Sequence, residues 1–260
     1  MTQELRDSLK AIARRSLPGG SRGAPRVAVL CYHSVHPSSP TASVSSEGFR
    51  RQLEWLSNQC DVVPFDQVRT VADRGSCRRP VVAITFDDAF SDNYYHAWPV
   101  LAELEMPATF FITTGLVARQ PTVIERFARL LSVDSSAIEP LSWAQVAEMR
   151  SGGMSIGAHS VTHPNLAAIE ADEARWEIET SRRVLENVLG EDVTSFAYPF
   201  GKPKHAFTSR TVAQVRAAGF SHGGAITCRT LRRGGHPLRG PRIPINSDSL
   251  EGLQSVIAGA

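Results

Sequence analysis

The sequence lacks the features of a membrane-spanning, secreted or disulfide-rich protein. No apolar run approaches the roughly 18 residues needed to cross a bilayer. The N-terminal segment, MTQELRDSLKAIARRSL, has no apolar core of the kind that marks a signal peptide. The four cysteines are widely spaced and contain no Cys-x-x-Cys pair, which excludes a disulfide framework and a zinc knuckle and favours a reducing compartment. We therefore expect a protein of the cytoplasm or of the cytoplasmic face of a membrane.

Nucleic-acid-binding patterns are also missing. There is no helix-turn-helix pattern and no zinc finger, and the aromatic residues are not interleaved with arginines, so we expect no nucleic-acid partner. The net charge is only +2, but residues 193–247 hold nine basic and no acidic side chains. Two interpretations stay open: a face that meets an anionic partner, or a solvated surface balanced by acidic neighbours in the fold.

Residues 1–26 differ in composition from the rest of the chain. They combine basic residues with apolar ones at helical spacing (Leu5, Leu9 and Ile12) and then pass into a Pro/Gly/Ser-rich linker at 17–25. Such an amphipathic arm is typical of segments that bind an anionic membrane surface, so peripheral membrane contact is one expectation here. We divide the chain into an arm and linker, 1–26, and one large domain, 27–260, and leave the oligomeric state open.

Short β-branched or aromatic runs alternate with longer helical stretches, which predicts βα units and a mainly parallel sheet. About seven such units favour a closed barrel over an open sheet. The residues 114–140 are predicted to be an insertion without clear elements. The predicted strands are Val27–Tyr32, Val81–Phe86, Thr109–Thr113, Met154–Ala158, Thr194–Tyr198, Ala225–Thr227 and Arg242–Ile245. The predicted helices are Phe49–Gln59, Asp92–Leu104, Ser142–Ser151, Ala171–Leu189 and Ser209–Ala218.

Polar residues follow most of the predicted strands. His33 follows the first strand, Asp87 and Asp88 follow the second, and His159 follows the fourth. Because the C-terminal strand ends of a βα barrel share one rim, we expect these side chains to lie together there.

The adjacent carboxylates of Asp87 and Asp88 end an apolar strand, where an unpaired buried charge is costly. Glycosidase chemistry needs two carboxyl groups about 5 Å or more apart across a sugar ring, which neighbours in sequence seldom provide. A better match is a metal site in which one carboxylate binds the ion and the other accepts a proton. The alternative is a pair that caps the following helix.

His159 and His163 are spaced i and i+4, which lets both face one ion from a single helical turn. Together with Asp88 they make three protein ligands, which leaves one position open for water, as in catalytic zinc sites. A water bound in this way has a pKa near 7 and is a nucleophile at neutral pH. Buried or capping histidines are the alternative for each imidazole.

Three blocks make the chain resemble the polysaccharide deacetylase (NodB-homology) family, over roughly residues 27–247: Thr85–Asp88, His159–Pro164 and Phe196–Gly201. The resemblance implies a single-domain, distorted (β/α)7 TIM-like barrel. It also implies a metal-dependent de-N-acetylase that hydrolyses the acetamide of an N-acetylated amino sugar in a poly- or oligosaccharide and releases acetate. The implied cofactor is a divalent metal ion, with Zn²⁺ first and Co²⁺, Ni²⁺ and Mn²⁺ as alternatives.

The resemblance also assigns roles to residues. Asp87 corresponds to the general base, and Asp88, His159 and His163 correspond to the metal ligands. The backbone N–H of Phe200 is expected to stabilise the oxyanion, a role that survives side-chain change because it belongs to the main chain.

Two departures from the family pattern leave alternatives open. The family's base-orienting arginine is replaced by Ala197, and our candidate substitute is Arg242, which is otherwise a surface residue. The family's Leu-x-x-His block stands at the front, as Leu30–His33, which resembles the permuted branch that includes poly-N-acetylglucosamine deacetylases. His33 is then the general acid for the leaving amine, or merely a hydrogen-bonding residue beneath the rim.

The remaining predicted site residues concern the substrate. We expect Tyr198, Pro199 and Arg242 to line the substrate site, with Tyr198 either stacking on a sugar or packing against Phe200. Two rival functions stay open: hydrolysis of another carbon–nitrogen bond in a small amide, and a catalytically silent saccharide-binding domain, which the loss of the arginine at Ala197 favours.

Overall fold

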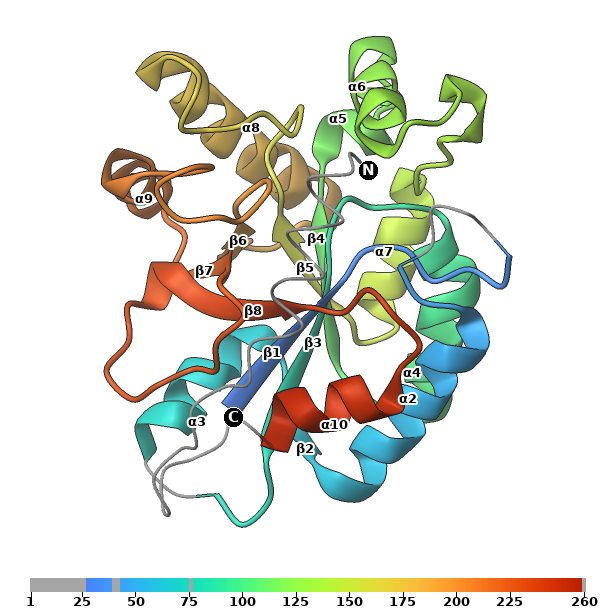
Figure 1. Cartoon of the computed structure of the whole chain (residues 1–260). Helices are drawn as coiled ribbons and strands as arrows, with labels where there is room; N and C mark the ends of the chain where they lie inside the picture. Colours follow the sequence, from blue (N-terminus) through green and yellow to red (C-terminus); the bar gives the residue numbers. More distant parts are fainter. Residues whose placement is uncertain (1–26, 39–42, 75–76, 259–260) are drawn as a thin grey trace.

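The computed structural model describes residues 27–38, 43–74 and 77–258, so the predicted arm at 1–26 lies outside the described residues. Seven parallel strands close into a ring in the order β1, β8, β7, β6, β5, β4, β3, with β3 pairing again with β1. This closure confirms the predicted (β/α)7 barrel (Figure 1). The strands of the ring are β1 (Val27–Tyr32), β3 (Val81–Phe86), β4 (Ala108–Ile112), β5 (Ser155–Ala158), β6 (Ser195–Ala197), β7 (His222–Ile226) and β8 (Gly240–Pro244). A short strand, β2 (Asp61–Val62), pairs with the start of β3.

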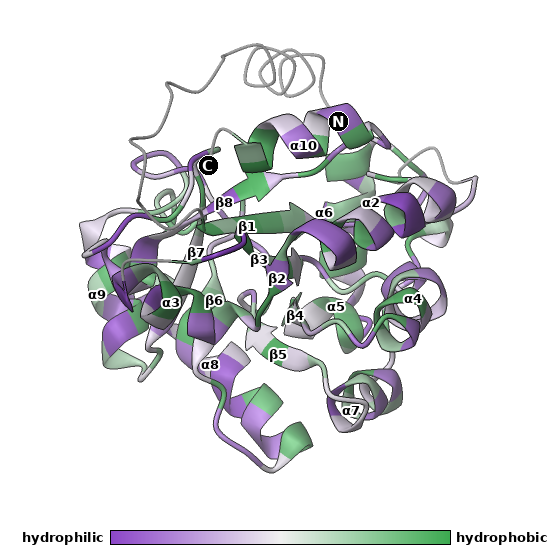
Figure 2. Ribbon diagram, turned by 90° about the horizontal axis from the view of Figure 1, so that it is seen from below, coloured by the Kyte–Doolittle hydropathy of each residue, from purple (hydrophilic) through white to green (hydrophobic). Residues whose placement is uncertain are grey.

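Helices surround this ring, as the view in Figure 2 shows. No helix within the described ranges is long and apolar enough to cross a membrane. The α-helices are α2 (Ser46–Gln59), α3 (Val68–Arg74), α4 (Trp98–Glu103), α5 (Thr114–Val117), α6 (Pro121–Leu131), α7 (Trp143–Ser151), α8 (Ala171–Leu189), α9 (Ser209–Ala217) and α10 (Leu250–Ala258). One π-helix, η2 (Asn93–Ala97), precedes α4, and short 3₁₀ turns occupy Phe65–Gln67, Ser135–Ala137 and Pro237–Arg239.

The best-predicted elements have strong local signals. β1 and β3 are buried along their whole length, which is why both are nearly continuous apolar runs, as expected of parallel strands covered on both faces. A capping box between Ser142 and Gln145 starts α7. α8 has the predicted bounds and ends at Gly190, whose φ of 69° a side chain would disfavour.

The predicted bounds are less accurate for strands whose composition gives a weak signal. β7 contains Gly223 and Gly224, and β8 contains two prolines, so both strands have little β propensity and are placed by the closure of the ring instead. The segment 114–140 is not featureless. It contains α5 and α6, and Pro121 begins α6 at a position where its missing N–H costs nothing. Phe127 of α6 packs with Phe90 and Leu116 beside the rim.

Candidate active site

The two adjacent carboxylates follow β3 at the point where regular strand geometry stops. Successive side chains of a strand point to opposite faces, so Asp87 and Asp88 can serve one site only if the backbone turns between them. It does: Asp88 has a φ of 77° and Ala89 a φ of 85°, both in the left-handed region. The side chains of Asp87 and Asp88 are both buried at the rim.

Asp88, His159 and His163 converge. The Nε2 atoms of His159 and His163 lie 3.6 Å and 3.5 Å from Oδ1 of Asp88. Two ligands bound tetrahedrally to one zinc ion at about 2.0–2.1 Å lie about 3.3 Å apart, so this spacing suits a shared cation. All three side chains are buried.

The protonation preferences of these groups also fit a cation. Burial lowers the pKa of His159 to about 4 and lowers the pKa of His163 well below its usual value, so both imidazoles are neutral and able to bind metal. Burial, and then the neighbouring Asp87, raise the pKa of Asp88. Oδ1 of Asp88 is buried without a hydrogen-bond partner, which is costly unless a cation approaches it.

The histidine spacing does not come from a helical turn, as we had expected. Residues 159–163 form an irregular loop in which Ser160 and His163 have φ values of 63° and 56°. The backbone oxygen of Ala197 lies 2.8 Å from Nδ1 of His159, which leaves Nε2 to face Asp88. Ser160 Oγ accepts the backbone N–H of His163 at 3.0 Å. The two imidazoles therefore come together through this loop and not through a helical turn, and their role as metal ligands stays a prediction.

Asp87 has a cationic partner within the chain. Arg242 donates from both terminal nitrogens to the two carboxylate oxygens of Asp87, at 2.6 Å and 2.7 Å. Arg242 is 0% exposed, which excludes the surface alternative, and its guanidinium lies 5.1 Å from the ring centre of Phe111. Burial alone would raise the pKa of Asp87, but Arg242 and then His159 lower it below its usual range, so this carboxylate is ionised.

Small residues make room for this arginine. β6 places Ala197 opposite Gly224 of β7. A Cβ atom on Gly224 would lie 2.6 Å from Nε of Arg242, so only glycine leaves the guanidinium its path from β8 towards Asp87. Arg242 therefore reaches Asp87 from β8, whereas Ala197 lies on β6. We expected Arg242 both as the substitute for the missing arginine and as a substrate-binding residue, and its contacts here are with Asp87.

Cys31 and His33 also lie close to Asp87. One nitrogen of His33, the Sγ of Cys31 and a carboxylate oxygen of Asp87 lie within 4.8 Å of one another. The Cys31 thiol donates to Oδ2 of Asp87 at 3.4 Å, and burial raises the pKa of that thiol. We missed Cys31, although its place two residues before His33 puts both side chains on one face of the strand.

His33 is half-buried, and Asn93 Nδ2 donates to its backbone oxygen at 2.9 Å. Burial lowers the pKa of His33, with Asp87 acting in the opposite direction and Arg242 in the same one. Its place beside the base is compatible with proton transfer at the rim, and the general-acid role stays a prediction.

Phe200 lies next to the metal-ligand group. Its ring is 4.8 Å from that of His163 and is 45% exposed. The backbone at Phe200 has a φ of 61°, and the following Gly201 is packed so closely on Ile226 that a Cβ atom would lie 2.3 Å from it. Within the described residues no acceptor takes the N–H of Phe200, which leaves that donor available. Its oxyanion role stays a prediction.

The structure corrects the expectation for Tyr198 and Pro199. Tyr198 is 1% exposed, its ring stacks on Phe207 at 3.8 Å, and its hydroxyl donates to the backbone oxygen of Leu238. Pro199 is buried as well. Neither residue offers a face to a sugar, and Tyr198 packs against Phe207 rather than Phe200.

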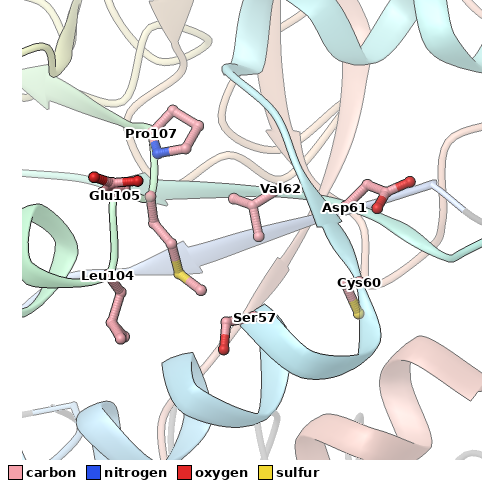
Figure 3. Close-up of a pocket in the computed structure, with 8 residues that line it drawn as sticks. Ser57, Cys60, Asp61, Val62, Leu104, Glu105 and Pro107 are labelled. Atoms are coloured by element: carbon pink, nitrogen blue, oxygen red, sulfur yellow. The ribbon is translucent and has the colours of Figure 1, made fainter.

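A pocket lies at the opposite end of the barrel, where β2 and β4 begin (Figure 3). One of its carboxylates, Asp61, is paired with Arg79 at 3.5 Å. None of the predicted site residues contributes to it. Its lining residues are Ser57, Cys60, Asp61, Val62, Leu104, Glu105, Met106 and Pro107.

Comparison with known proteins agrees with this site. Residues 74–223 match the family model described as polysaccharide deacetylase. The chain is 24% identical over 215 residues to the poly-beta-1,6-N-acetyl-D-glucosamine N-deacetylase of Staphylococcus aureus (strain MSSA476), covering 81% of this chain and 70% of that protein. The chain is also 24% identical to YxkH of Bacillus subtilis (strain 168) over 200 residues. This match covers 76% of the present chain and 63% of that relative's length. The structure of the Streptococcus pyogenes deacetylase PplD in complex with acetate superimposes with a TM-score of 0.74 at 25% identity, covering 89% of this chain and 97% of that one.

Proposed function

Because the chain belongs to the polysaccharide deacetylase family, we propose that it is a metal-dependent hydrolase that removes the acetyl group from an N-acetylated amino sugar in a poly- or oligosaccharide. The observation that carries this proposal is the pairing of two neighbouring centres: the Asp88, His159 and His163 group, and the Arg242-held carboxylate of Asp87. A bound divalent cation would polarise the acetamide and supply a nucleophilic water. Zn²⁺ is our first choice because two imidazoles and one carboxylate are typical zinc ligands.

Two residues of the chain carry out the proton transfers, and a third stabilises the oxyanion. Asp87, ionised and held by Arg242, accepts a proton from the attacking water. The N–H of Phe200 donates to the carbonyl oxygen as it gains negative charge. His33 then protonates the sugar nitrogen as the carbon–nitrogen bond breaks. The products are acetate and a free amino sugar.

A β-1,6-linked N-acetylglucosamine polymer is our proposed substrate. Its support is the similarity to the Staphylococcus aureus enzyme named for that polymer. The chain also places its histidine block at the front, as in the permuted branch that it resembles.

The silent-domain alternative loses its main support. It depended on Ala197 standing where the family has an arginine, and Arg242 supplies that contact to Asp87 from β8. We therefore expect turnover rather than binding alone.

The test is acetate release by purified protein of known metal content. The substrates are β-1,6-linked N-acetylglucosamine oligomers, β-1,4-linked oligomers of equal length, and a panel of small N-acetylated amides. Acetate release from the β-1,6 oligomers, lost on chelation and restored by Zn²⁺, is the expected result. Turnover of the small amides alone would refute the saccharide assignment.

For localisation we propose contact between residues 1–26 and the anionic cytoplasmic face of a membrane, supported by the basic and apolar pattern of that segment. Removal of residues 1–26 should reduce co-sedimentation with anionic vesicles. If recovery with vesicles is unchanged, this proposal is wrong.

A further inference from the structure

Glu177 is a buried carboxylate outside the metal-ligand group. It contacts the loop 159–163, which carries the two histidines of that group. It lies on α8 and is 2% exposed. Its Oε2 accepts the backbone N–H groups of Val161 and Thr162, both at 2.8 Å, and its Oε1 accepts the hydroxyl of Thr162 at 2.6 Å. We propose that Glu177 is a positioning residue that holds the loop 159–163 in the conformation that binds the metal ion. This inference rests on the metal-dependent function proposed above.

The loop needs an external brace because its own conformation is unfavourable. Ser160 and His163 both have positive φ values, which are uncommon for residues with side chains and persist only where the surroundings enforce them. Between them, Val161 and Thr162 turn their N–H groups towards α8. Without an acceptor these two buried donors would be unpaired, and the loop would gain by changing conformation.

The other contacts of the loop use different groups. The N–H groups of Thr114 and Gly115, at the start of α5, donate to the backbone oxygens of Ser160 and Val161 at 3.2 Å and 2.8 Å. These bonds hold the carbonyl side of the loop. Among the described residues, Glu177 alone accepts the two amides on the opposite side. The loop is therefore held between α5 and α8, which pack together outside the barrel (Figure 1).

Thr162 extends this contact to the insertion. Its hydroxyl donates to Glu177 and accepts from the Arg126 guanidinium of α6 at 3.4 Å. The consequence falls on His163, the residue after Thr162, whose Nε2 must stay near Asp88. Loss of the brace should therefore be felt as weaker metal binding.

The experiment compares Glu177→Ala and Glu177→Gln with Glu179→Ala, which removes an exposed carboxylate from the same helix. Dissociation constants for Co²⁺ and Zn²⁺ come from competition with a chelator, and the visible spectrum of the Co²⁺ form reports ligand geometry. We expect Glu177→Ala to weaken metal binding by about 10–100-fold, the range for groups that orient metal ligands, and to alter the Co²⁺ spectrum. Glu177→Gln should recover part of the affinity, because its amide oxygen can still accept the two N–H groups. Glu179→Ala should match the wild type.

A second measurement keeps the inference testable if the affinity cannot be determined. Hydrogen exchange of the metal-free proteins should show faster exchange of the amides of residues 160–163 in Glu177→Ala than in Glu179→Ala. If Glu177→Ala does not fold, Thr162→Val removes the hydroxyl contacts with Glu177 and Arg126, keeps the two amide contacts, and should weaken metal binding by a smaller factor.

Wild-type metal affinity together with wild-type amide protection in Glu177→Ala would overturn the inference, even if its thermal stability falls. The proposed function fails separately, when metal-loaded wild-type protein releases no acetate from any of the oligomers. The two results are read from different measurements.

Discussion

Asp87 and Asp88 are neighbours in sequence, yet the chain treats their charges in opposite ways. Asp87 receives two hydrogen bonds from Arg242 and one from Cys31, and its pKa is lowered despite burial. Asp88 faces two neutral imidazoles, has one buried oxygen without a partner, and has a raised pKa. The negative charge of Asp87 is thus balanced by Arg242 within the chain. Asp88 has no such partner, and its charge would be balanced by a bound cation. This difference distinguishes the two carboxylates more clearly than their positions in the sequence do, and it fits the roles that we propose for them.

The largest effect is expected when the charge of Asp88 is removed. Asp88→Asn keeps the shape of the side chain and tolerates its left-handed backbone, but it removes the only anionic ligand of the group. We expect metal affinity to fall by more than about 100-fold, beyond the loss caused by outer groups, and acetate release to fall to background. Elemental analysis and a chelator titration provide the measurement. Retention of stoichiometric metal under competition would contradict the assignment of Asp88.

The matching substitution at Asp87 should lower turnover without changing metal binding. Asp87→Asn removes the proton acceptor, so acetate release should fall by about 10²–10⁴-fold while metal content stays that of the wild type. Acetate assays on protein with verified metal content check this prediction. If Asp87→Asn loses its metal as Asp88→Asn does, the two carboxylates do not have distinct roles.

The third prediction concerns the ion pair itself. Arg242→Met leaves Asp87 buried without its partner, which should destabilise the metal-free protein by about 3–5 kcal/mol. The double variant Asp87→Asn/Arg242→Met removes both charges and should recover part of that loss. Urea unfolding of the two single variants and the double variant measures the coupling. Additive effects would mean that the contact contributes no coupling to stability.

The sequence indicates the three candidate metal ligands more directly than it indicates the partner of Asp87. The residues Asp88, His159 and His163 stand in compact blocks beside strong strand signals, so their shared position at the rim follows from the order of the elements. The partner of Asp87 is different. Arg242 lies on a strand with two prolines and 155 residues further along the chain, and its approach depends on a glycine in a third strand. No local pattern encodes a path of that kind.

A similar reason explains why the sequence did not indicate Glu177 and why Tyr198 was expected to line the substrate site. Glu177 lies on a helix whose apolar spacing predicted its bounds correctly, but a single buried glutamate on such a helix has no signature in the sequence. Tyr198 follows β6 among rim residues, yet the packing of Phe207 decides that it is a core residue. The sequence pattern predicts the helices and strands, whereas long-range packing decides which of their side chains face the site.

A smaller effect is expected when a side chain is added at Gly224, beside Arg242. Gly224→Ala places a methyl group against Nε of Arg242 and should cost about 1–3 kcal/mol while lowering turnover and leaving metal affinity unchanged. Gly252→Ala is the matched control, because alanine is favoured over glycine within α10. Equal thermal unfolding curves for both variants would show that the contact at Gly224 relaxes without displacing Arg242.

The smallest effect is expected at the exposed aromatic residue beside the metal-ligand group. Phe200→Gly keeps the backbone N–H and suits the positive φ, so stability should change by about 0.5 kcal/mol or less, and kcat by about threefold or less. The metal dissociation constant should be that of the wild type. A large loss of kcat would assign a role to the ring rather than to the main chain.

The route that Arg242 takes has a consequence for how relatives of this protein are judged. Since every strand of the ring ends at the same opening, a guanidinium can reach Asp87 from more than one of them when a neighbouring strand has a glycine beside its path. An arginine missing from its usual motif is therefore weak evidence that a homologue is a pseudoenzyme. Inventories of inactive members should first look for a cation relocated elsewhere in three dimensions.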